Sequence, residues 1–314
     1  MTDPGPTSTG HETVGVVVVT YNRADLLRRT LTALAASTRA AEKVYVVDNA
    51  STDHTAQVLA ESRLPGLEVI RLSENTGGAG GFRTGVEAAT AAGLDRIWLI
   101  DDDVVPAPDC LAVLMAADED CLMVVREDLS GALVEKAALT FDLRRWWIAK
   151  PKTAMVETRY GTRENMPARV PVENVAFEGF MLRRSVVEQI GLPDDSFFIF
   201  YDDVDYAIRA RKAGHTIWAL RDAVLVRQLD FNQQHDLAGW KGYYMYRNLF
   251  AVHFRHGENA LVRAKPWWLA LAVVLLSPLR SGLRGTVGES RNVLRALRDA
   301  RRMRRTPGAP TRSP

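Results

Sequence analysis

The first hundred residues alternate short apolar runs with helical patterns, and this alternation constrains the fold more than any other feature of the sequence. The run GVVVVT (Gly15–Thr20) is unbroken and β-branched, as is typical of a strand buried on both faces. A stripe of leucines at Leu27, Leu31 and Leu34 follows with helical spacing. Similar apolar runs recur at KVYVVD (43–48), LEVIRL (67–72) and RIWLI (96–100). Such strand–helix units predict right-handed crossovers and a mostly parallel sheet flanked by helices.

The pattern becomes less regular after residue 103. Residues 122–172 are aromatic-rich and show no clear period. Beyond them, the sequence predicts a strand running into a helix (175–185), a strand end, turn and amphipathic helix (197–214), two short strands (215–220 and 223–229) and a long aromatic helix (239–254). A length of 314 residues suits one large α/β domain with an appendage. We therefore divide the chain into a disordered tail (1–13), an α/β domain (14–260) and a C-terminal segment (261–314).

The C-terminal segment has the composition of a membrane-surface element. Its apolar run, 266–279, is too short to span a bilayer comfortably and opens with Trp267 and Trp268. Ten arginines face two acids between residues 280 and 314. Because tryptophan favours the headgroup level and arginine favours anionic lipid, we expect 266–279 and the basic tail to lie on a membrane surface. A helix buried against the domain is the alternative interpretation.

Several classes of protein fit this sequence poorly. Two cysteines, Cys110 and Cys121, are too few for a disulfide framework or a zinc site and fit a reducing compartment. The N-terminal residues lack the basic start and apolar core of a signal peptide. No nucleic-acid-binding motif accompanies the basic tail, so nucleic acid is not an expected partner. We expect a cytoplasmic protein that is peripheral on the inner face of the plasma membrane.

Polar or glycine-rich residues follow each of the four predicted strands. They are TYNR (20–23), DNASTD (48–53), NTGGAGGF (75–82) and the triplet Asp101, Asp102 and Asp103. In an open parallel sheet ligands bind beyond the carboxyl ends of the strands, so these residues predict one binding crevice. The glycine run matches neither a Walker loop nor the dinucleotide fingerprint. It predicts close approach of the backbone to a ligand, with a flexible linker as the alternative.

Two acidic clusters are candidates for chemistry. Asp101 and Asp103 lie on the same side of an extended chain and suit Mg²⁺ or Mn²⁺ bridging to a diphosphate. The second cluster is Asp202, Asp203 and Asp205. A carboxylate there could act as a general base if burial beside aromatic residues raises its pKa. For both clusters the alternative is helix capping, with Asp205 and Arg209 as an i,i+4 pair.

Together these motifs resemble the family 2 inverting glycosyltransferases. The resemblance rests on VVVVTYNR, VVDNASTD, NTGGAGGF, the Asp101–Asp103 triplet and FFIFYDDVDYAIRARKAGH, and it covers about 14–254. With the later YYMYRN, the pattern is similar to actinobacterial galactofuranosyltransferases and related rhamnosyltransferases. The resemblance implies an α/β GT-A (nucleotide-diphospho-sugar transferase) fold, with a mostly parallel central sheet flanked by helices and a C-terminal helical extension.

The resemblance also implies a role for individual residues. The implied donor-binding residues are Thr20, Arg23, Asp48, Asn75, Gly77, Gly78, Arg83, Asp101 and Asp102, with Asp48 facing the base. Asp101 and Asp103 would hold a divalent cation, Mn²⁺ or Mg²⁺. Asp203 would be the catalytic base, assisted by Asp202. Phe177, Glu178 and Gly179 would flank the acceptor.

One position departs from the family pattern. Metal-dependent relatives place a histidine ligand where this chain has Arg227. Either His235 reaches the metal, or carboxylates and diphosphate hold it alone, or Arg227 itself neutralises the diphosphate. A shift of a few residues in the alignment is a further alternative.

The resemblance thus implies an inverting glycosyltransferase. It would move galactofuranose from a UDP-linked donor to a hydroxyl of a polyprenyl-linked or cell-wall glycan acceptor. A rhamnosyltransferase using a dTDP-linked donor is the main alternative. A nucleotidyltransferase-type enzyme fits less well, because TYNR lacks a basic glycine-rich loop after the first strand.

Overall fold

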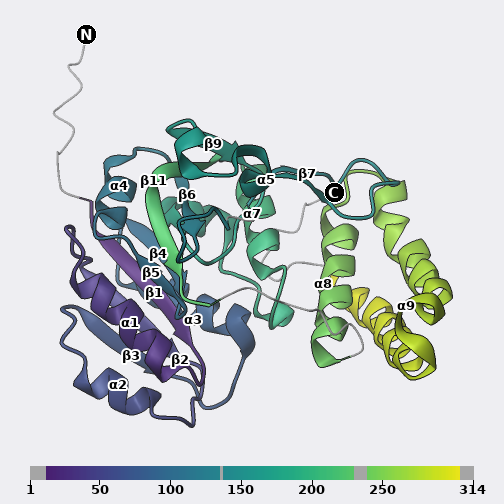
Figure 1. The fold of residues 1–314 in the computed structure, drawn as a ribbon, viewed down its shortest axis with the longest axis horizontal. Coiled ribbons are helices and arrows are strands. Elements are labelled where there is room, and N and C mark those ends of the chain that lie inside the picture. Colours follow the sequence, from purple (N-terminus) through teal and green to yellow (C-terminus); the bar gives the residue numbers. More distant parts are fainter. Residues whose placement is uncertain (1–11, 135–136, 230–238, 305–314) are drawn as a thin grey trace, which may run out of the picture.

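A computed structural model describes residues 12–134, 137–229 and 239–304, without the side chains of 277–287 and 304. Within these residues a nine-stranded sheet has the strand order β3-β2-β1-β4-β10-β6-β11-β5, and β9 pairs with β11. Helices cover both faces, and α8 and α9 extend the molecule on one side (Figure 1). Most of the expected tail 1–13, the basic residues 305–314 and His235 lie outside the described residues.

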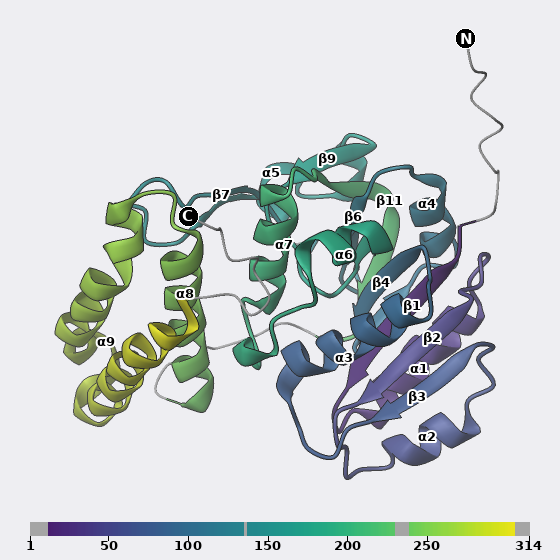
Figure 2. The same ribbon diagram turned by 180° about the vertical axis from the view of Figure 1, so that it is seen from behind.

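The first half of the sheet forms as the alternating pattern predicts. Its elements are β1 (Val14–Thr20), α1 (Ala24–Ala35), β2 (Lys43–Asp48), α2 (Thr55–Glu61), β3 (Leu67–Arg71), α3 (Gly77–Ala91) and β4 (Arg96–Asp101). Strands β1 to β4 are parallel, and every residue of β1 is buried. The two helices α1 and α2 lie on one face and α3 on the other, as comparison of Figures 1 and 2 shows.

Two glycines of α3 let this helix lie close against β1. A Cβ added at Gly81 would stand 2.5 Å from Val19 Cγ1, and one at Gly85 would stand 2.2 Å from Val17 Cγ1. No real Cβ contact is that short, so a side chain at either position would push α3 off the sheet. Part of the glycine-rich segment therefore serves helix–sheet packing.

The second half of the domain mixes strand directions. Its elements are β5 (Val104–Pro106), α4 (Cys110–Ala116), β6 (Cys121–Glu127), β7 (Ala138–Phe141), β8 (Lys152–Met155), α5 (Val156–Tyr160), η1 (Arg163–Asn165), β9 (Arg169–Val172), β10 (Phe180–Arg183), α6 (Arg184–Ile190), η2 (Asp195–Phe197), α7 (Asp202–Lys212) and β11 (Ile217–Arg227). Strands β5, β9 and β10 run antiparallel to their neighbours.

Three predictions for this half were wrong. Residues 122–172 are not irregular but contain β6, β7, β8, α5 and β9. The sequence did not reveal them because strands that pair with distant segments need not show a local hydrophobic period. The strand end expected at 197–201 is a tight turn in which Phe198, Phe200 and Tyr201 have positive φ. The two expected short strands form one strand, β11, whose pairing with β6 shifts register between Ala219 and Val224.

A helical extension follows the sheet. Helix α8 (Trp240–His256) is the predicted aromatic helix, and α9 (Ala260–Ala300) packs beside it. A straight helix of this length would span about 60 Å. The start of α9 and the turn after its end nevertheless both contact the end of α8, through Arg263 Nη1 to Gly257 O (2.9 Å) and Arg255 to the Met303 carbonyl. Helix α9 therefore doubles back on itself, as Figures 1 and 2 show. The short turn η3 (Arg302–Arg304) follows it.

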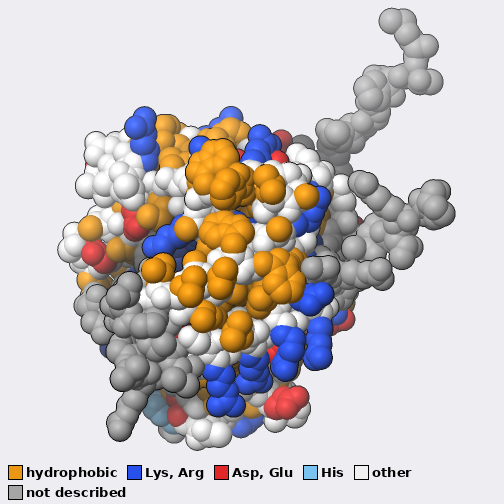
Figure 3. Space-filling model, turned by 90° about the vertical axis from the view of Figure 1, so that its right-hand side faces the viewer, with side chains coloured by type: hydrophobic (Ala, Val, Ile, Leu, Met, Phe, Trp, Pro, Cys, Tyr) orange, Lys and Arg blue, Asp and Glu red, His pale blue; other side chains and the backbone are white. Residues whose placement is uncertain are grey.

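The extension carries an apolar surface. Figure 3 views the molecule from this side and shows hydrophobic side chains gathered in its middle with lysines and arginines beside them. The exposed large apolar residues of α9 and of the loop between β7 and β8 are Trp146, Trp147, Leu261, Trp267, Leu271, Leu275, Leu276 and Leu294, here called the apolar face. Among the helices in the described ranges, none has both the length and the hydropathy needed to cross a bilayer.

Candidate active site

The polar ends of the parallel strands meet at one edge of the sheet, as predicted. In the β1 ladders Thr20 lies opposite Asp48, and Val19 lies opposite Asp101. Asp48 is buried, and its Oδ1 accepts the Ser51 N–H at 2.8 Å. This bond fixes the carboxylate at the turn after β2. Its contact with a nucleobase stays a prediction.

The aspartate triplet is tied to the turn after β1. The Thr20 hydroxyl donates to Asp102 Oδ2 at 2.7 Å. Arg23 Nη1 lies 3.2 Å from Asp102 Oδ1 and 3.1 Å from Asp103 Oδ2. The Thr30 hydroxyl donates to the backbone carbonyl of Asp102 at 2.9 Å. The structure therefore brings together the residues predicted after the first and fourth strands.

Every carboxyl group of this triplet has a raised pKa. Burial is the main cause, and for Asp101 the neighbouring charges of Glu178, Asp103 and Asp102 add to it. Burial raises the pKa of Asp102 to about 6 against the opposing effects of Arg23 and Thr20. Burial and Glu178 raise the pKa of Asp103, while Arg23 and Arg227 oppose them. The negative charge is thus only partly compensated by the protein.

Glu178 lies at the centre of the site. Its Oε2 is 2.6 Å from Arg126 Nη1 and 3.4 Å from Arg227 Nε. Its charge raises the pKa values of Asp101, Asp103 and Asp203. Glu178 therefore joins the two acidic clusters that the sequence singled out separately. Sequence reasoning placed Glu178 beside the acceptor and missed Arg126, because the strand carrying Arg126 was not recognised.

The other two predicted acceptor residues are packed in the interior. Phe177 is buried, with its ring centroid 4.8 Å from that of Phe82. Gly179 has a φ of +124°, and a Cβ there would stand 2.1 Å from Val124 Cγ2. These contacts hold the backbone on both sides of Glu178. Of the three residues, only Glu178 has its side chain among the charged groups of the site.

Arg227 lies where the family pattern led us to expect it, beside the aspartate triplet. It pairs with Val104 in the β11–β5 ladder, and the next residue, Gln228, donates its N–H to Asp103 O at 2.9 Å. Arg227 is buried, and its positive charge lowers the pKa of Asp103. A guanidinium cannot ligate a cation. It supplies positive charge at this point instead.

The second acidic cluster lies at the start of α7, and its members have different surroundings. Asp202 is buried and Asp203 is partly exposed. Burial raises the pKa of both, and Glu178 adds to the effect on Asp203 while Lys152 and Arg126 oppose it. Lys152 lies on β8 and had no signal in the sequence that could have found it. Burial thus acts on the Asp203 carboxyl group in the direction that a general base would need; its role as the base stays a prediction.

Asp205 faces the other way and belongs to a buried ion cluster. Its Oδ2 accepts from Arg209 Nε at 2.9 Å, which confirms the i,i+4 pair, and its Oδ1 lies 3.3 Å from Arg255 Nη1. His256 Nε2 lies 2.8 Å from Asp205 Oδ1, while Lys212 Nζ lies 3.2 Å from His256 Nδ1. The imidazole is therefore a neutral donor, in agreement with the lowering of its pKa by burial.

The turn between η2 and α7 is strained. Phe198, Phe200 and Tyr201 have φ values of +64°, +67° and +66°. Side chains of this size rarely adopt such angles, which cost about 1–3 kcal/mol each. This turn, 196–201, delivers the chain to Asp202 and Asp203. Sequence reasoning missed it because positive φ at aromatic residues has no local signal.

The glycine turn before α3 is held by two asparagines. Asn49 Nδ2 donates to Gly77 O at 2.9 Å, and Gly77 N–H donates to Asn75 Oδ1 at 2.8 Å. Gly77 has a φ of +74°, while a Cβ at Gly78 would meet nothing within 4 Å. Gly78 therefore borders open space. Arg83 instead donates to Pro193 O at 3.2 Å, so it ties α3 to the segment before the strained turn.

The acids partly fit a divalent cation. Among the described residues there is no group of three or more histidine, cysteine, aspartate or glutamate side chains arranged to hold a metal. Asp103 Oδ1 is buried and has no hydrogen-bond partner, and burial and neighbouring acids raise the pKa of Asp101. This donor set suits a cation held by carboxylates together with diphosphate oxygens and water. His235 lies outside the described residues, so its predicted part cannot be placed.

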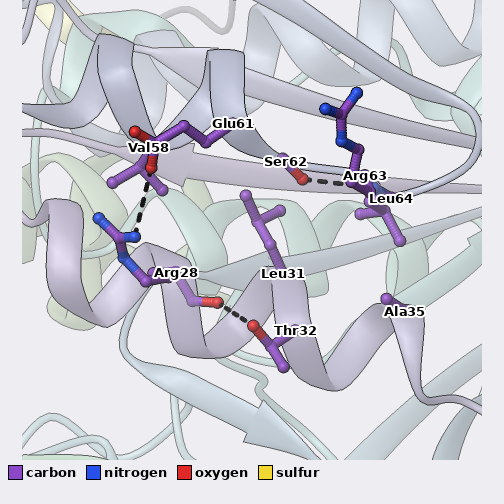
Figure 4. A pocket seen from close by; sticks show the side chains of 9 residues that line it. All are labelled: Arg28, Leu31, Thr32, Ala35, Val58, Glu61, Ser62, Arg63 and Leu64. Carbon is purple, nitrogen blue, oxygen red and sulfur yellow. Dashed lines mark hydrogen bonds and ion pairs between the residues drawn. The ribbon is translucent and has the colours of Figure 1, made fainter.

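A separate surface hollow of about 270 Å³ lies between α1 and α2 (Figure 4). It is lined by Arg28, Leu31, Thr32, Ala35, Val58, Glu61, Ser62, Arg63 and Leu64. An ion pair joins Arg28 Nη1 and Glu61 Oε2 at 3.5 Å. None of the predicted site residues lines this hollow.

Comparison with known proteins gives the chain a family. The sequence profile described as Glycosyl transferase family 2 matches residues 15–191. Galactofuranosyltransferase GlfT1 of Mycobacterium tuberculosis is 32% identical over 215 residues, covering 68% of this chain and 69% of that protein. The N-acetylglucosaminyl-diphospho-decaprenol L-rhamnosyltransferase of the same organism is 28% identical over 313 residues, covering 92% of this chain and 95% of that protein.

Solved structures agree on the fold. Mannosyltransferase PcManGT from Pyrobaculum calidifontis, in complex with GDP-Man and Mn²⁺, has a TM-score of 0.55 at 21% identity and covers 96% of this chain and 86% of that one. S. aureus TarS 1-349 in complex with UDP-GlcNAc has a TM-score of 0.57 at 17% identity, with coverage of 93% and 88%. The predicted GT-A fold is confirmed.

Proposed function

The chain belongs to glycosyl transferase family 2 and is a glycosyltransferase, and we propose that it transfers galactofuranose from UDP-galactofuranose with inversion. The acceptor is a hydroxyl of a polyprenyl-linked or cell-wall glycan. Likeness to GlfT1 supports this choice of sugar. A second candidate is rhamnosyl transfer from dTDP-rhamnose, which the match to the rhamnosyltransferase supports because it extends over 92% of the chain.

One observation carries the proposal. Five carboxyl groups, from Asp101, Asp102, Asp103, Glu178 and Asp203, meet at the carboxyl edge of the sheet, and we call them the acidic edge. Burial and mutual repulsion raise the pKa values of the four aspartates. Such an arrangement destabilises the folded state, and perturbed carboxyl groups in a crevice are typical of active sites.

Asp203 is the general base of the proposed reaction. It is partly exposed, and burial raises its pKa toward working pH, so it can accept the proton of the acceptor hydroxyl. The oxygen then attacks the anomeric carbon from the face opposite the leaving group. A new C–O bond forms as the bond from the anomeric carbon to the nucleoside diphosphate breaks, and configuration inverts. Buried Asp202 orients the acceptor beside Asp203.

Positive charge for the leaving diphosphate comes from this chain's own arginines. Arg23 reaches Asp102 and Asp103 from the turn after β1, and the positive charge of Arg227 also acts on Asp103. Asp101 and Asp103 would hold a Mn²⁺ or Mg²⁺ ion, which when bound neutralises diphosphate charge. The open space at Gly78 leaves room for the donor. Thr20, Asp48, Asn75 and Gly77 complete the proposed donor site, and Arg83 would join it only by leaving Pro193 O.

The apolar face supports a lipid-linked acceptor and a membrane location. Trp147 is 62% exposed, and Trp146 lies edge-on to Trp268 of α9 with ring centroids 6.3 Å apart. Trp267, Leu271 and Leu275 continue this surface along one stripe of α9. Exposed arginines 291, 295, 298, 301 and 302 lie on the returning half of the extension. Apolar and basic side chains together suit the surface of an anionic bilayer (Figure 3).

The loop that carries Trp146 and Trp147 also leads directly into the site. Five residues after Trp147, Lys152 begins β8 and acts on the charge of Asp203. A bilayer against this loop would present a polyprenyl-linked sugar near the proposed base.

Donor binding is the first test of the proposed function. The full chain is titrated calorimetrically with UDP-galactofuranose, UDP-galactopyranose, UDP and dTDP-rhamnose, with and without Mn²⁺. We expect selective binding of the uridine donors and tighter binding with Mn²⁺. An Asp103→Asn variant should lose the Mn²⁺ dependence, while Asp222→Asn, on the exposed side of β11, should retain it.

The other outcomes decide between the candidates. Preference for the thymidine donor would move the assignment to rhamnosyl transfer. Equal binding with and without Mn²⁺ would mean that Arg23 and Arg227 neutralise the diphosphate without a metal. Binding of none of these nucleotides would overturn the proposal.

A further inference from the structure

The strained turn 196–201 needs something that holds it. Its three positive φ angles fall on aromatic residues directly before the proposed base. Strain of this kind persists only where surrounding groups fix the backbone more strongly than the local preference opposes it. The groups that fix it here belong to α8.

Asn248 supplies most of the hold. Its side chain is fully buried, and Nδ2 lies 2.9 Å from Phe197 O, 2.7 Å from Ile199 O and 2.9 Å from Phe200 O. One amide nitrogen thus meets three carbonyls of the strained turn. Carbonyl groups turned inward without a donor would be costly, so the amide stabilises this backbone shape.

Arg247 orients that amide. Its Nε donates to Asn248 Oδ1 at 2.8 Å, which directs the amide nitrogen toward the turn. Its Nη2 donates to Ser196 O at 2.6 Å and to Phe197 O at 2.8 Å. The two neighbouring residues of α8 therefore bind four of the carbonyls in 196–201.

The same turn touches the glycine turn at the donor side. Ala79 N–H donates to Phe198 O at 3.1 Å, and a Cβ at Gly77 would stand only 2.0 Å from that oxygen. The ring of Phe198 stacks on Tyr244 of α8 with centroids 5.0 Å apart. Phe198 therefore sits between α8 and the start of α3, and Asp203 follows a few residues later.

We propose that Asn248, oriented by Arg247, is a positioning residue that sets the distance between Asp203 and the donor turn at Gly77–Ala79. It acts through the backbone of 196–201 and touches no reacting atom. The inference rests on the proposed function, since it assigns Asp203 as the base. Sugar transfer requires the acceptor oxygen to lie within reach of both the carboxylate of the base and the anomeric carbon of the donor.

A purely structural role would look different. Helix α8 is already tied to the domain by Arg255, whose Nη1 lies 2.7 Å from Asp194 Oδ2, and by His256 on Asp205. The Nδ2 contacts of Asn248 go to the strained turn alone. Loss of the amide should therefore loosen the turn while leaving α8 attached.

The test compares two asparagines of the same extension. Asn248→Asp keeps the side-chain volume, removes the N–H donors and turns an oxygen toward three carbonyls. Asn292→Asp is the matched control, because Asn292 Nδ2 donates to Gly239 O at 2.9 Å, away from the turn. Hydrogen exchange of amides 196–204, the dissociation constant for UDP, kcat and its pH profile are measured on the full chain.

In Asn248→Asp we expect exchange across 196–204 to accelerate at least about tenfold and kcat to fall at least about 50-fold. The dissociation constant for UDP should stay within about threefold. The acid limb of kcat should move to lower pH, because a loosened turn exposes Asp203 and its pKa then falls. Asp202, Glu178, Lys152 and Arg126 face the same carboxyl group and are unchanged in both variants. Asn292→Asp should match the wild type in all four measurements.

Exchange at the wild-type rate in Asn248→Asp, or an equal loss of UDP affinity and kcat in both variants, would overturn the inference. If Asn248→Asp does not fold, Arg247→Ala carries the test, with the same directions and a smaller loss of kcat, about tenfold. If the wild type transfers no sugar, the proposed function fails by itself. The exchange rates then still report whether Asn248 holds the turn.

Discussion

Two buried groups of charged side chains meet on α7 and differ in their balance of charge. At the acidic edge, the aspartate pKa values stay raised by burial and by neighbouring acids. The positive charges of Arg23, Arg126, Arg227 and Lys152 oppose this rise but do not cancel it. The ion cluster consists of Asp194, Asp205, Arg209, Arg255 and the neutral His256. There, the His256 hydrogen bond and the two arginines outweigh burial and lower the pKa of Asp205 to about 2.

The difference in charge balance distinguishes a group of acids available for catalysis from an ion cluster that stabilises the fold. Asp203 and Asp205 are two residues apart on the same helix, where Asp205 is buried and Asp203 is partly exposed. The carboxylate of Asp205 has two arginines and a histidine to stabilise its charge, whereas that of Asp203 has not. Charge balance, rather than burial or sequence position, distinguishes the group available for chemistry.

The largest expected effect is on the acidic edge. Asp203→Asn removes the proposed base and should lower kcat by about 10²–10⁴. The dissociation constant for the donor and the thermal midpoint should change little, because Asp203 forms no ion pair with another described residue. Steady-state kinetics and calorimetry measure both. A variant that kept more than a tenth of the wild-type kcat would remove Asp203 from the catalytic role.

A substitution in the ion cluster should lower the free energy of unfolding. Asp205→Asn leaves Arg209 and Arg255 without their shared carboxylate, and breaking a buried pair in this way costs about 3–5 kcal/mol. Denaturant unfolding measures the loss. In the wild type, the contribution of Asp205 is present above its unfolded pKa and is lost as pH falls toward 2. If the free energy of unfolding fell by less than about 1 kcal/mol, the ion cluster would not be a main source of stability.

The acidic edge should also give stability the opposite dependence on pH. The pKa of Asp102 is raised to about 6, so the folded state binds a proton more readily than the unfolded chain. Stability should then fall as pH rises from about 4 to 6, by at most about 3 kcal/mol for this group. Asp102→Asn should flatten that slope in a series of unfolding curves. An unchanged slope would place the titration elsewhere.

The smallest effect is expected where charges are neither buried nor crowded. The Arg28–Glu61 pair beside the hollow between α1 and α2 is about half exposed on both sides (Figure 4). Arg28→Ala should change the free energy of unfolding by less than about 1 kcal/mol and leave kcat unchanged. A larger loss would show that exposure alone does not separate strong from weak pairs in this protein.

Much of the first half of the fold could be predicted. Strands β1 to β4 carry local signals, such as the β-branched run at 15–20, and their polar ends had to meet because parallel strands share one edge. The pairing of Asp205 with Arg209 was also predictable, since i,i+4 spacing on a helix is a local property.

The second half could not be predicted to the same degree. The turn at 196–201 adopts angles that its own residues disfavour, and the side chains that bind its carbonyls, Arg247 and Asn248, come about fifty residues later in the chain. Arg126 and Lys152 joined the site through strands whose pairing partners are distant in the chain. Contacts between residues far apart in the chain produce no periodic pattern in the local sequence.

The sequence by itself determined the family, the parallel sheet and the acids at its edge, because each depends on residues close together in the chain. Tertiary structure alone decided which acids are stabilised as ions and which keep a raised pKa. That choice depends on how many cations the folded chain brings to each carboxyl group. It also decided where Asp203 stands, because α8 holds the turn that delivers it.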